Sequence, residues 1–397
     1  MIEDFKTARL DHAVGARTGG DAVQTIIRPA DFEAAYSEIR QWQGYAPTPL
    51  LSLKNLAAHL GVSDILYKDE GPRFGLGSFK ALGGAYAALR VLQQELSQQS
   101  GTETSAADIR SGALKDRCSA ITLVSATDGN HGRSLAWGCQ RFGAQCKIYI
   151  HAEVSEGRAE AMRAYGADVI RIKGDYDASV ALAREEAARN GWFVVSDTSW
   201  EGYTTPPRDV MAGYGVMVRE ICDVMQTPPT HVLLQGGVGG LAAAVAAGLI
   251  QRYGPEAPRV IVVEPDRAAC LYQSAKAGRA TTVKIDEETI MAGLSCGEPS
   301  GLAWSVLDAV ADDFLTIPDR LVAPTIRMLA RADFKDAPVE AGESAVAGLA
   351  AVIAACQQAD LRTALRLDSN ARVLVIGSEG VTDPAIFDAI MKGANHV

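Results

Sequence analysis

The sequence has no cysteine pattern that would indicate a disulfide framework or a metal site. Its seven cysteines are scattered, and no two of them form a C-x-x-C pair. We therefore expect reduced thiols, as in a cytoplasmic protein. Basic residues are also in deficit, because 38 Lys and Arg face 48 Asp and Glu for a formal net charge of −10. An acidic surface repels phosphate backbones and anionic lipids, which argues against nucleic acid and membrane as partners.

Long hydrophobic runs are missing as well. The longest apolar run extends from about 241 to 250, whereas a membrane-spanning helix needs roughly 20 residues. The first residues, MIEDFKTARLDH, lack the basic start and apolar segment of a signal peptide. The histidines show no metal-ligand spacing, and we predict no metal site.

Short runs rich in Val, Ile and Leu alternate with amphipathic patterns through most of the chain. Continuous apolar strands separated by helices are typical of parallel sheets covered on both faces. The 397 residues, 48% of them hydrophobic, favour two domains of the α/β class. The segment from about 97 to 119 is expected to be a surface excursion with a short helix. The predicted strands are 65–68, 120–124, 147–150, 169–172, 193–195, 231–234, 260–263 and 373–376, and the predicted helices include 155–165, 177–189, 207–225, 241–253 and 343–358.

A glycine-rich loop joins the predicted strand 231–234 to the helix after it. Glycine lets the backbone approach an anion closely, and a helix N-terminus adds free N–H groups and a positive dipole end. We interpret the loop as a phosphate cradle, and a tight strand-to-helix turn is the simpler alternative. The loop consists of Gln235, Gly236, Gly237, Val238, Gly239 and Gly240.

The same loop is also compatible with a dinucleotide. Residues 237–242 match G-x-G-x-x-A, and Glu264 ends the next predicted strand, where a ribose-binding acid would lie. A nicotinamide-dependent oxidoreductase is therefore an alternative function. The position of the loop, beyond residue 230, counts against it, because this fingerprint normally opens the first β-α-β unit of a chain.

Lys80 has an unusual place in the sequence. It follows a glycine-rich loop and lies in the first turn of a predicted helix. The positive end of the helix dipole disfavours a cation there and favours the neutral amine that Schiff-base formation needs. Taken alone, an ordinary surface lysine is the simpler explanation of this residue.

Three motifs, in the same order, resemble those of the fold-type II enzymes that use pyridoxal 5′-phosphate (PLP), the threonine dehydratase and tryptophan synthase β-like group. GSFKALGGAY is similar to the PLP-lysine motif of this group, and GGVGG to its phosphate loop. ATDGNHG is similar to the segment whose Asn contacts the 3′-oxygen of PLP and which receives the substrate carboxylate. The resemblance implies that Lys80 carries PLP as a Schiff base, that Asn130 and Phe79 contact the cofactor, and that 236–240 hold its phosphate.

The chain is similar in particular to the diaminopropionate ammonia-lyases, from about 45 to 383. Shared stretches include KDEGPRFGLGSFKALGGAYA, ATDGNHGRSLAW, SDTSWEGY and IMAGLSCGEP. ATDGNHG is the most specific, because generic dehydratases carry this segment without the residue that corresponds to Asp128. Members of the family are homodimers of two-domain α/β subunits that convert 2,3-diaminopropionate into pyruvate and two ammonia molecules.

The resemblance also implies the domain layout and the acid–base residues. Each of two domains would hold a mostly parallel sheet covered by helices, the larger formed by 1–71 with 195–397 and the smaller by 72–194, with PLP in the cleft between them. Asp128 and Asp197 would exchange protons with the substrate and, with Thr127, bind it. From the residues alone, a turn-forming Asp128 and a helix-capping Asp197 are the simpler explanation.

Two departures from the family pattern bear on the substrate and on the cofactor. Gly77-Ser78 replaces the usual Asn-Ala and resembles a threonine dehydratase, so a serine/threonine-type dehydratase, or a lyase of another β-substituted amino acid, stays open. Gly377 replaces the hydroxyl residue expected beside the pyridine nitrogen, and Ser378, one place along, is the remaining candidate. A PLP-binding protein without turnover is a further alternative.

Overall fold

The computed structural model describes residues 2–127 and 129–394. The chain divides into two compact units. Unit 1 consists of Met1–Pro29, Pro47–Phe79 and Met217–Val397, and unit 2 of Ala30–Ala46 and Lys80–Val216. The predicted smaller domain, 72–194, shares residues 80–194 with unit 2, and its boundaries stay a prediction.

Among the described residues, unit 1 holds a seven-stranded sheet in the order β1-β10-β9-β8-β11-β3-β2. The inner strands are parallel, and β1 and β2 pair antiparallel at the two edges. The carboxyl ends of β9, β8, β11 and β3 therefore lie side by side. The strands are β1 His12–Val14, β2 Leu50–Ser52, β3 Asp64–Asp69, β8 His231–Gln235, β9 Arg259–Pro265, β10 Asp313–Ile317 and β11 Arg372–Gly377.

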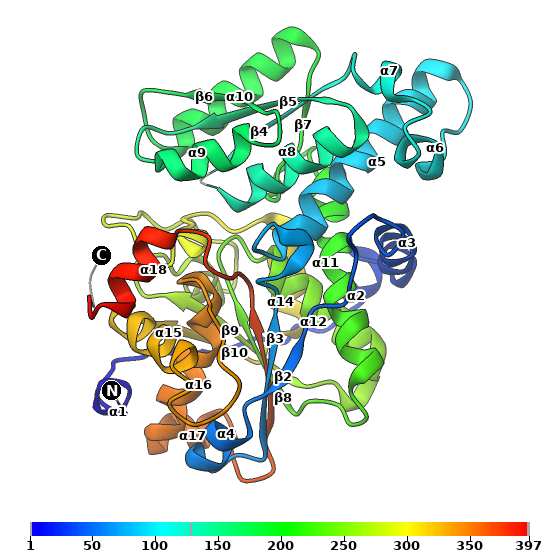
Figure 1. The fold of residues 1–397 in the computed structure, drawn as a ribbon. Helices are drawn as coiled ribbons and strands as arrows, with labels where there is room; N and C mark the ends of the chain where they lie inside the picture. The colour runs from blue at the N-terminus through cyan, green and yellow to red at the C-terminus, as the bar shows by residue number, and fades with distance from the viewer. Residues whose placement is uncertain (1, 128, 395–397) are drawn as a thin grey trace. The chain divides into compact units, whose positions relative to one another are not determined.

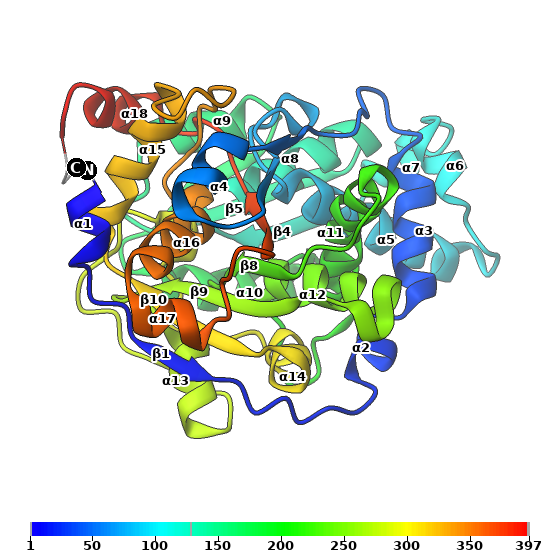
Figure 2. The ribbon, with the colours of Figure 1, turned by 90° about the horizontal axis from the view of Figure 1, so that it is seen from below.

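Helices cover both faces of this sheet. Figure 2 shows α12 and α16 on opposite sides of β8, a strand whose five residues are all buried. Such burial explains the unbroken apolar run at 231–234. The helices of unit 1 are α1 Ile2–Lys6, α2 Ala22–Thr25, α4 Lys54–Leu60, α12 Gly240–Tyr253, α13 Cys270–Ala277, α14 Gly301–Val310, α15 Val322–Ala330, α16 Ala347–Gln357, α17 Ala359–Ala364 and α18 Pro384–Met391.

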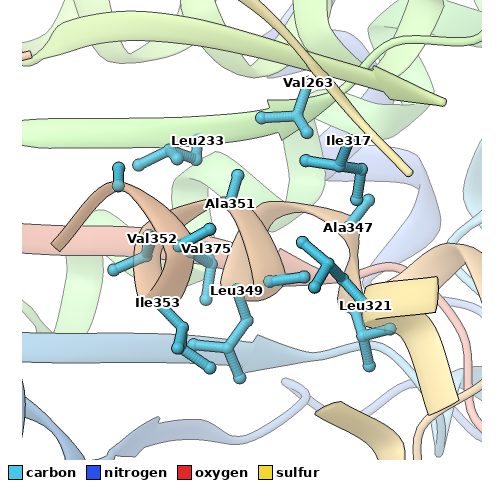
Figure 3. Close-up of a cluster of buried hydrophobic side chains, with 14 of the residues drawn as sticks. Leu233, Val263, Ile317, Leu321, Ala347, Leu349, Ala351, Val352, Ile353 and Val375 are labelled. Carbon is cyan, nitrogen blue, oxygen red and sulfur yellow. The ribbon is translucent and has the colours of Figure 1, made fainter. Parts of the chain in front are cut away.

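Helix α16 forms the centre of the larger core. Residues 347–356 are buried all round the helix, and most of them are Ala, Val, Leu or Ile. The small alanines let the helix lie close to the sheet, and each buried Val, Leu or Ile contributes about 1.5–3 kcal/mol. Figure 3 shows this layer, with Ala347, Leu349, Ala351, Val352 and Ile353 of α16 beside Leu233, Val263, Ile317 and Val375 of the strands.

The described part of unit 2 holds a four-stranded parallel sheet in the order β6-β5-β4-β7. Within this unit, α8 and α9 lie on one side of the sheet and α10 on the other (Figure 1). Two helices, α3 Pro29–Ile39 and α11 Thr205–Val224, contribute residues to both units. The other elements are α5 Lys80–Ser100, α6 Ala106–Arg110, α7 Lys115–Cys118, β4 Thr122–Ala126, α8 Asn130–Phe142, β5 Gln145–Ile150, α9 Glu156–Arg163, β6 Asp168–Arg171, α10 Tyr176–Asn190 and β7 Phe193–Val194.

The α/β class and the parallel sheets are as predicted, and every predicted strand has a counterpart. The sequence patterns missed β1, β2 and β10. The segment 97–119 includes the end of α5 and two short helices, α6 and α7. None of the described helices is long and apolar enough to cross a membrane.

Candidate active site

The amine of Lys80 forms an ion pair at the start of α5. Lys80 is the first residue of this helix, and its Nζ donates to a carboxylate oxygen of Asp197. The side chains of Lys80 and Asp197 are 19% and 15% exposed, so the pair is accessible. Burial raises the pKa of the Asp197 carboxyl, but attraction to Lys80 and His131 outweighs it and holds that pKa well below its ordinary value. Asp197 is thus an anion that stays paired with the amine of Lys80.

Tyr203 supports the loop that carries Asp197. Its hydroxyl donates to the carbonyl oxygen of Val194 at 2.9 Å and accepts the N–H of Ser196 at 3.0 Å. Its ring stacks on Trp200, with the ring centroids 3.9 Å apart. These bonds hold the chain immediately before Asp197, so the segment SDTSWEGY forms its own support for the carboxylate.

His131 also contacts the Asp197 loop. β4 and β7 are parallel neighbours, so the segments that follow them lie close together. The Nε2 of His131 lies 2.9 Å from the carbonyl oxygen of Val195, and its Nδ1 lies 4.0 Å from Asp197. Burial lowers the pKa of His131, although Asp197 partly opposes this, so the ring is neutral at pH 7. His131 therefore orients the loop.

The predicted substrate-binding segment lies between β4 and α8. The Oγ1 of Thr127 accepts the N–H groups of Gly129 and Gly132 at 3.2 and 3.4 Å. Asn130 begins α8, and its Oδ1 accepts a hydrogen bond from Arg133 at 2.8 Å. These bonds close the turn next to the Asp197 loop. Asp128, the second predicted acid, lies outside the residues that the structure describes.

Two glycines let other helices approach the turn that carries Lys80. A Cβ on Gly83 would lie 2.4 Å from a ring carbon of Tyr214 on α11. A Cβ on Gly84 would lie 2.6 Å from the hydroxyl oxygen of Ser134 on α8. Any larger side chain would push these helices away, so the GG of GSFKALGGAY fixes the direction of α5 and hence of Lys80.

In unit 1, the glycine loop runs from β8 into α12. Gly237 and Gly239 have φ angles of 60° and 96°, in the left-handed region that favours glycine. Gly239 is the N-cap of α12 and has no side chain with which to cap the N–H groups of the first turn. The N-terminus of this 14-residue helix has the character that favours an anion, as predicted for a phosphate cradle.

Glu264 is not positioned to bind the ribose of a dinucleotide. It is 1% exposed, and its two oxygens accept the N–H groups of Leu271 and Tyr272 at 3.0 and 2.6 Å. Burial raises the pKa of this carboxyl to about 8, although these two bonds lower it. Glu264 is therefore a cap for α13 and is not available to bind a ribose.

The end of β11 lies next to the glycine loop. β8 and β11 are parallel neighbours, and Ser378 directly follows β11. Ser378 is buried, and its carbonyl oxygen accepts the N–H of Phe79 at 3.0 Å. Gly380 donates to the carbonyl oxygen of Gly77 at 2.9 Å. Within unit 1, the residues before Lys80 are therefore hydrogen-bonded to the segment that follows β11, so two of the predicted cofactor residues, Phe79 and Ser378, lie together.

Known proteins resemble this chain over nearly its whole length. The family of pyridoxal-phosphate dependent enzymes matches residues 41–379. A diaminopropionate ammonia-lyase of Escherichia coli is 40% identical over 359 residues, which cover 89% of each chain. The crystal structure of the Escherichia coli enzyme with an aminoacrylate-PLP azomethine reaction intermediate has a TM-score of 0.88 at 35% identity and covers 98% of both chains. The same enzyme with D-serine has a TM-score of 0.87 at 35% identity, again with 98% coverage.

The chain is therefore a PLP-dependent enzyme of fold-type II. Within this class, it belongs to the diaminopropionate ammonia-lyase family.

The described residues are suited to PLP. Unit 2 presents an accessible amine on Lys80, which forms an ion pair with the carboxylate of Asp197. Unit 1 presents a loop of four glycines and Val238 at the N-terminus of α12, which suits the predicted role of holding a phosphate. Among the residues described, no cluster of His, Cys, Asp or Glu has the composition of a metal site.

The sequence patterns pointed to Lys80, Asp197 and the glycine loop but missed the supporting tyrosines. Tyr203 belongs to SDTSWEGY, so its place in that segment was a signal. Tyr214 has no such signal in the sequence, because it lies inside an amphipathic helical pattern in which an aromatic residue indicates only a buried face. Burial raises the pKa of Tyr214 strongly, while Lys80 lowers it, which places the hydroxyl near the amine.

Proposed function

We propose that this protein is a PLP-dependent carbon–nitrogen lyase that converts 2,3-diaminopropionate and water into pyruvate and two ammonia molecules. The observation that carries the proposal is the Lys80–Asp197 pair, in a chain 40% identical to a diaminopropionate ammonia-lyase. An amine alone would serve many PLP reactions. A permanent anion beside it suits a substrate that brings a second, positively charged amine.

Each cofactor-binding role belongs to a described residue. Lys80 would hold PLP through its ε-amine, and residues 236–240 would hold the phosphate at the start of α12. Phe79, Asn130 and Ser378 would contact the rest of the cofactor. When bound, PLP supplies an electron sink for the charge that develops at the substrate Cα.

The protein's own side chains would manage the protons. Lys80 would remove the Cα proton on one face of the substrate, and Asp128 would do so on the opposite face. Asp197, which stays ionised, would hold the Lys80 amine in place and pair with the leaving amine. Thr127 would orient the substrate carboxylate.

A serine-type dehydratase is the second candidate, because the Escherichia coli relative was solved with D-serine. Gly77-Ser78 also resembles a threonine dehydratase. The two functions release different amounts of nitrogen. Serine yields one ammonia per pyruvate, and diaminopropionate yields two.

The deciding experiment measures pyruvate and ammonia from D- and L-diaminopropionate and from D- and L-serine. We expect two ammonia molecules per pyruvate, kcat/KM higher for diaminopropionate than for serine, and no pyruvate from Lys80→Ala. A higher kcat/KM for serine would replace the proposal with the dehydratase. Pyruvate formation by Lys80→Ala at the wild-type rate would remove Lys80 from the reaction.

We also propose that the protein is a cytoplasmic homodimer. The scattered cysteines and the resemblance to a family of homodimers support this. Light scattering coupled to size-exclusion chromatography should give twice the mass of the chain, and the mass of one chain would contradict it.

A further inference from the structure

The glycine loop of unit 1 packs on the end of β9 and the start of α13. Glu264 on β9 lies against the first glycine, because a Cβ at Gly236 would lie 2.4 Å from the Cγ of Glu264. Leu271, in the first turn of α13, contacts the same loop: its methyl carbons lie 3.2 Å from that Cβ position and 3.4 Å from a Cβ at Gly239. Glu264 and Leu271 therefore support the loop from the core.

The loop itself is a tight turn whose central peptide joins Gly237 and Val238. The N–H of Gly239 donates to the carbonyl oxygen of Gly236 at 3.1 Å, which closes the turn. Gly237 has a φ of 60°, and Val238 does not share this left-handed backbone, as in a type II′ turn. The orientation of the central peptide decides which way the N–H of Val238 points.

A buried thiol binds this central peptide. The Sγ of Cys270, the first residue of α13, donates to the carbonyl oxygen of Gly237 at 3.5 Å. In a planar trans peptide the C=O and the N–H point in opposite directions, so the thiol directs the N–H of Val238 away from itself. Cys270 is fully buried, whereas Val238 is the one residue of 236–240 that is partly exposed. The N–H of Val238 therefore faces the accessible side of the loop.

The carboxyl of Glu264 bears on where the single hydrogen of the thiol goes. Its Oε1 lies 3.7 Å from the Sγ of Cys270, so the thiol has two oxygens within reach. Both oxygens of Glu264 already accept N–H groups at the start of α13. Burial raises the pKa of this carboxyl to about 8, so it is mostly uncharged at pH 7 and attracts the thiol hydrogen less than a carboxylate would. The thiol hydrogen is therefore left for Gly237.

We propose that Cys270 and Glu264 are positioning residues for the phosphate of PLP. The thiol of Cys270, supported by the carboxyl of Glu264, holds the carbonyl of Gly237 inward and so presents the N–H of Val238 to the phosphate. The inference rests on the proposed function, in which residues 236–240 hold that phosphate. A backbone N–H binds a phosphate oxygen strongly only when it points at it. Both residues act on the phosphate end of the cofactor, so they should not affect a ligand that lacks the phosphate.

The first test measures the Kd of PLP and of pyridoxal, which lacks the phosphate, on the full-length protein after its PLP has been removed. We expect the wild type to prefer PLP, and Cys270→Ala to bind PLP about fivefold more weakly with the Kd of pyridoxal unchanged, as the loss of one oriented hydrogen bond implies. Cys270→Ser, whose hydroxyl can donate to the same carbonyl, should recover part of the preference. Cys356→Ala, which removes another buried thiol of unit 1, should bind both ligands as the wild type does.

The ratio of the two Kd values separates positioning from a structural role. Removal of a thiol that only packs would weaken both ligands alike or neither, so an unchanged ratio in Cys270→Ala would overturn the inference. A wild-type protein that binds PLP and pyridoxal equally would instead overturn the assignment of the phosphate to residues 236–240. A wild-type protein that binds no PLP would overturn the proposed function itself.

Phosphorus NMR of the protein saturated with PLP tests the hydrogen bonds of the phosphate without reference to activity. We expect Cys270→Ala to shift the phosphorus resonance of bound PLP from its wild-type position, and Cys356→Ala to leave it there. Glu264→Gln, whose amide still accepts and donates hydrogen bonds, should keep the wild-type resonance and Kd ratio, whereas Glu264→Leu should change both. A wild-type resonance in Cys270→Ala, or a wild-type Kd ratio in Glu264→Leu, would contradict the inference.

Discussion

At the scale of single residues, Asp197 is the side chain whose charge state most constrains the chemistry. Its pKa is depressed by Lys80 and His131 in spite of burial. A depressed carboxyl pKa contributes stability that is complete above the ordinary value of about 3.9 and is lost as the pH falls below it. Asp197 is therefore ionised across the whole range in which such an enzyme works.

We predict that Asp197→Asn destabilises the PLP-free protein by roughly 2 kcal/mol at pH 7, because Lys80 loses a charged partner. The difference should shrink as the pH falls from 4 toward 2, because the Asp197 carboxyl of the unfolded chain becomes protonated there while the folded protein keeps it charged. Urea unfolding of both proteins at pH 7 and pH 3 measures this. An equal difference at both values would show that charge is not the cause.

The stereochemical prediction concerns Asp128. If Lys80 and Asp128 serve opposite faces of the substrate, Asp128→Asn should reduce kcat/KM for one enantiomer of diaminopropionate by about a hundredfold and leave the other nearly unchanged. Lys80→Ala, which loses the anchor, should abolish both reactions. Steady-state kinetics with the separate enantiomers measure the effect. An equal loss for both enantiomers would rule out opposite faces.

Among the residues that the sequence motifs marked, two lie together in the structure. Lys80 and Asp197 follow glycine-rich or strand-end signals, and the structure brings their side chains together. Cys270 carried no such signal. A single cysteine outside any pair or cluster indicates only a small buried side chain, and its bond to Gly237 joins residues that are 33 apart in the sequence.

At the scale of elements, the position of Lys80 depends on close helix packing. Gly83→Ala would bring a methyl group within 2.4 Å of the Tyr214 ring. We predict a loss of about 1–3 kcal/mol in stability, together with slower turnover, because Lys80 begins the same helix. Gly157→Ala on α9 is the matched control, since nothing lies within 4 Å of its added carbon. It should stabilise the protein slightly. Thermal unfolding and kcat of both variants measure the contrast, and equal behaviour would contradict it.

The loop after β7 is the second element on which the site depends. Tyr203→Phe removes the hydroxyl that bonds Val194 and Ser196, and we predict that it lowers kcat about tenfold with little change in PLP affinity. Tyr165→Phe, after α9 in the same unit, is the control. A drop in PLP affinity with unchanged kcat would mean that Tyr203 supports the cofactor and not Asp197.

Elements were predicted best where they are buried on both sides. β8, β9 and β11 each contain a continuous apolar run, and a short run of this kind is more typical of a buried strand than of an exposed loop or an amphipathic helix. β10 was missed although all its residues are buried, because Asp313 opens it and Thr316 interrupts the apolar run. The edge strands β1 and β2 are three residues each, too short for any periodicity.

At the scale of the whole molecule, the shared stretches of sequence mix catalytic and structural residues. In KDEGPRF, Arg73 donates to Glu70 at 2.8 Å and to Glu220 at 2.7 Å, and Lys68 donates to Glu220 at 2.6 Å. All four side chains are buried in unit 1. These charges pair with one another inside the core of unit 1, so a sequence stretch shared with a family does not by itself mark an active site.

The central claim is that this enzyme works through PLP bound to Lys80, and the most direct measurement is the point of attachment. The protein is saturated with PLP, treated with borohydride to make the bond permanent, digested, and analysed by mass spectrometry. The account predicts a pyridoxyl phosphate group on Lys80, absent from Lys80→Ala. Labelling of a different lysine, or of none, would contradict it.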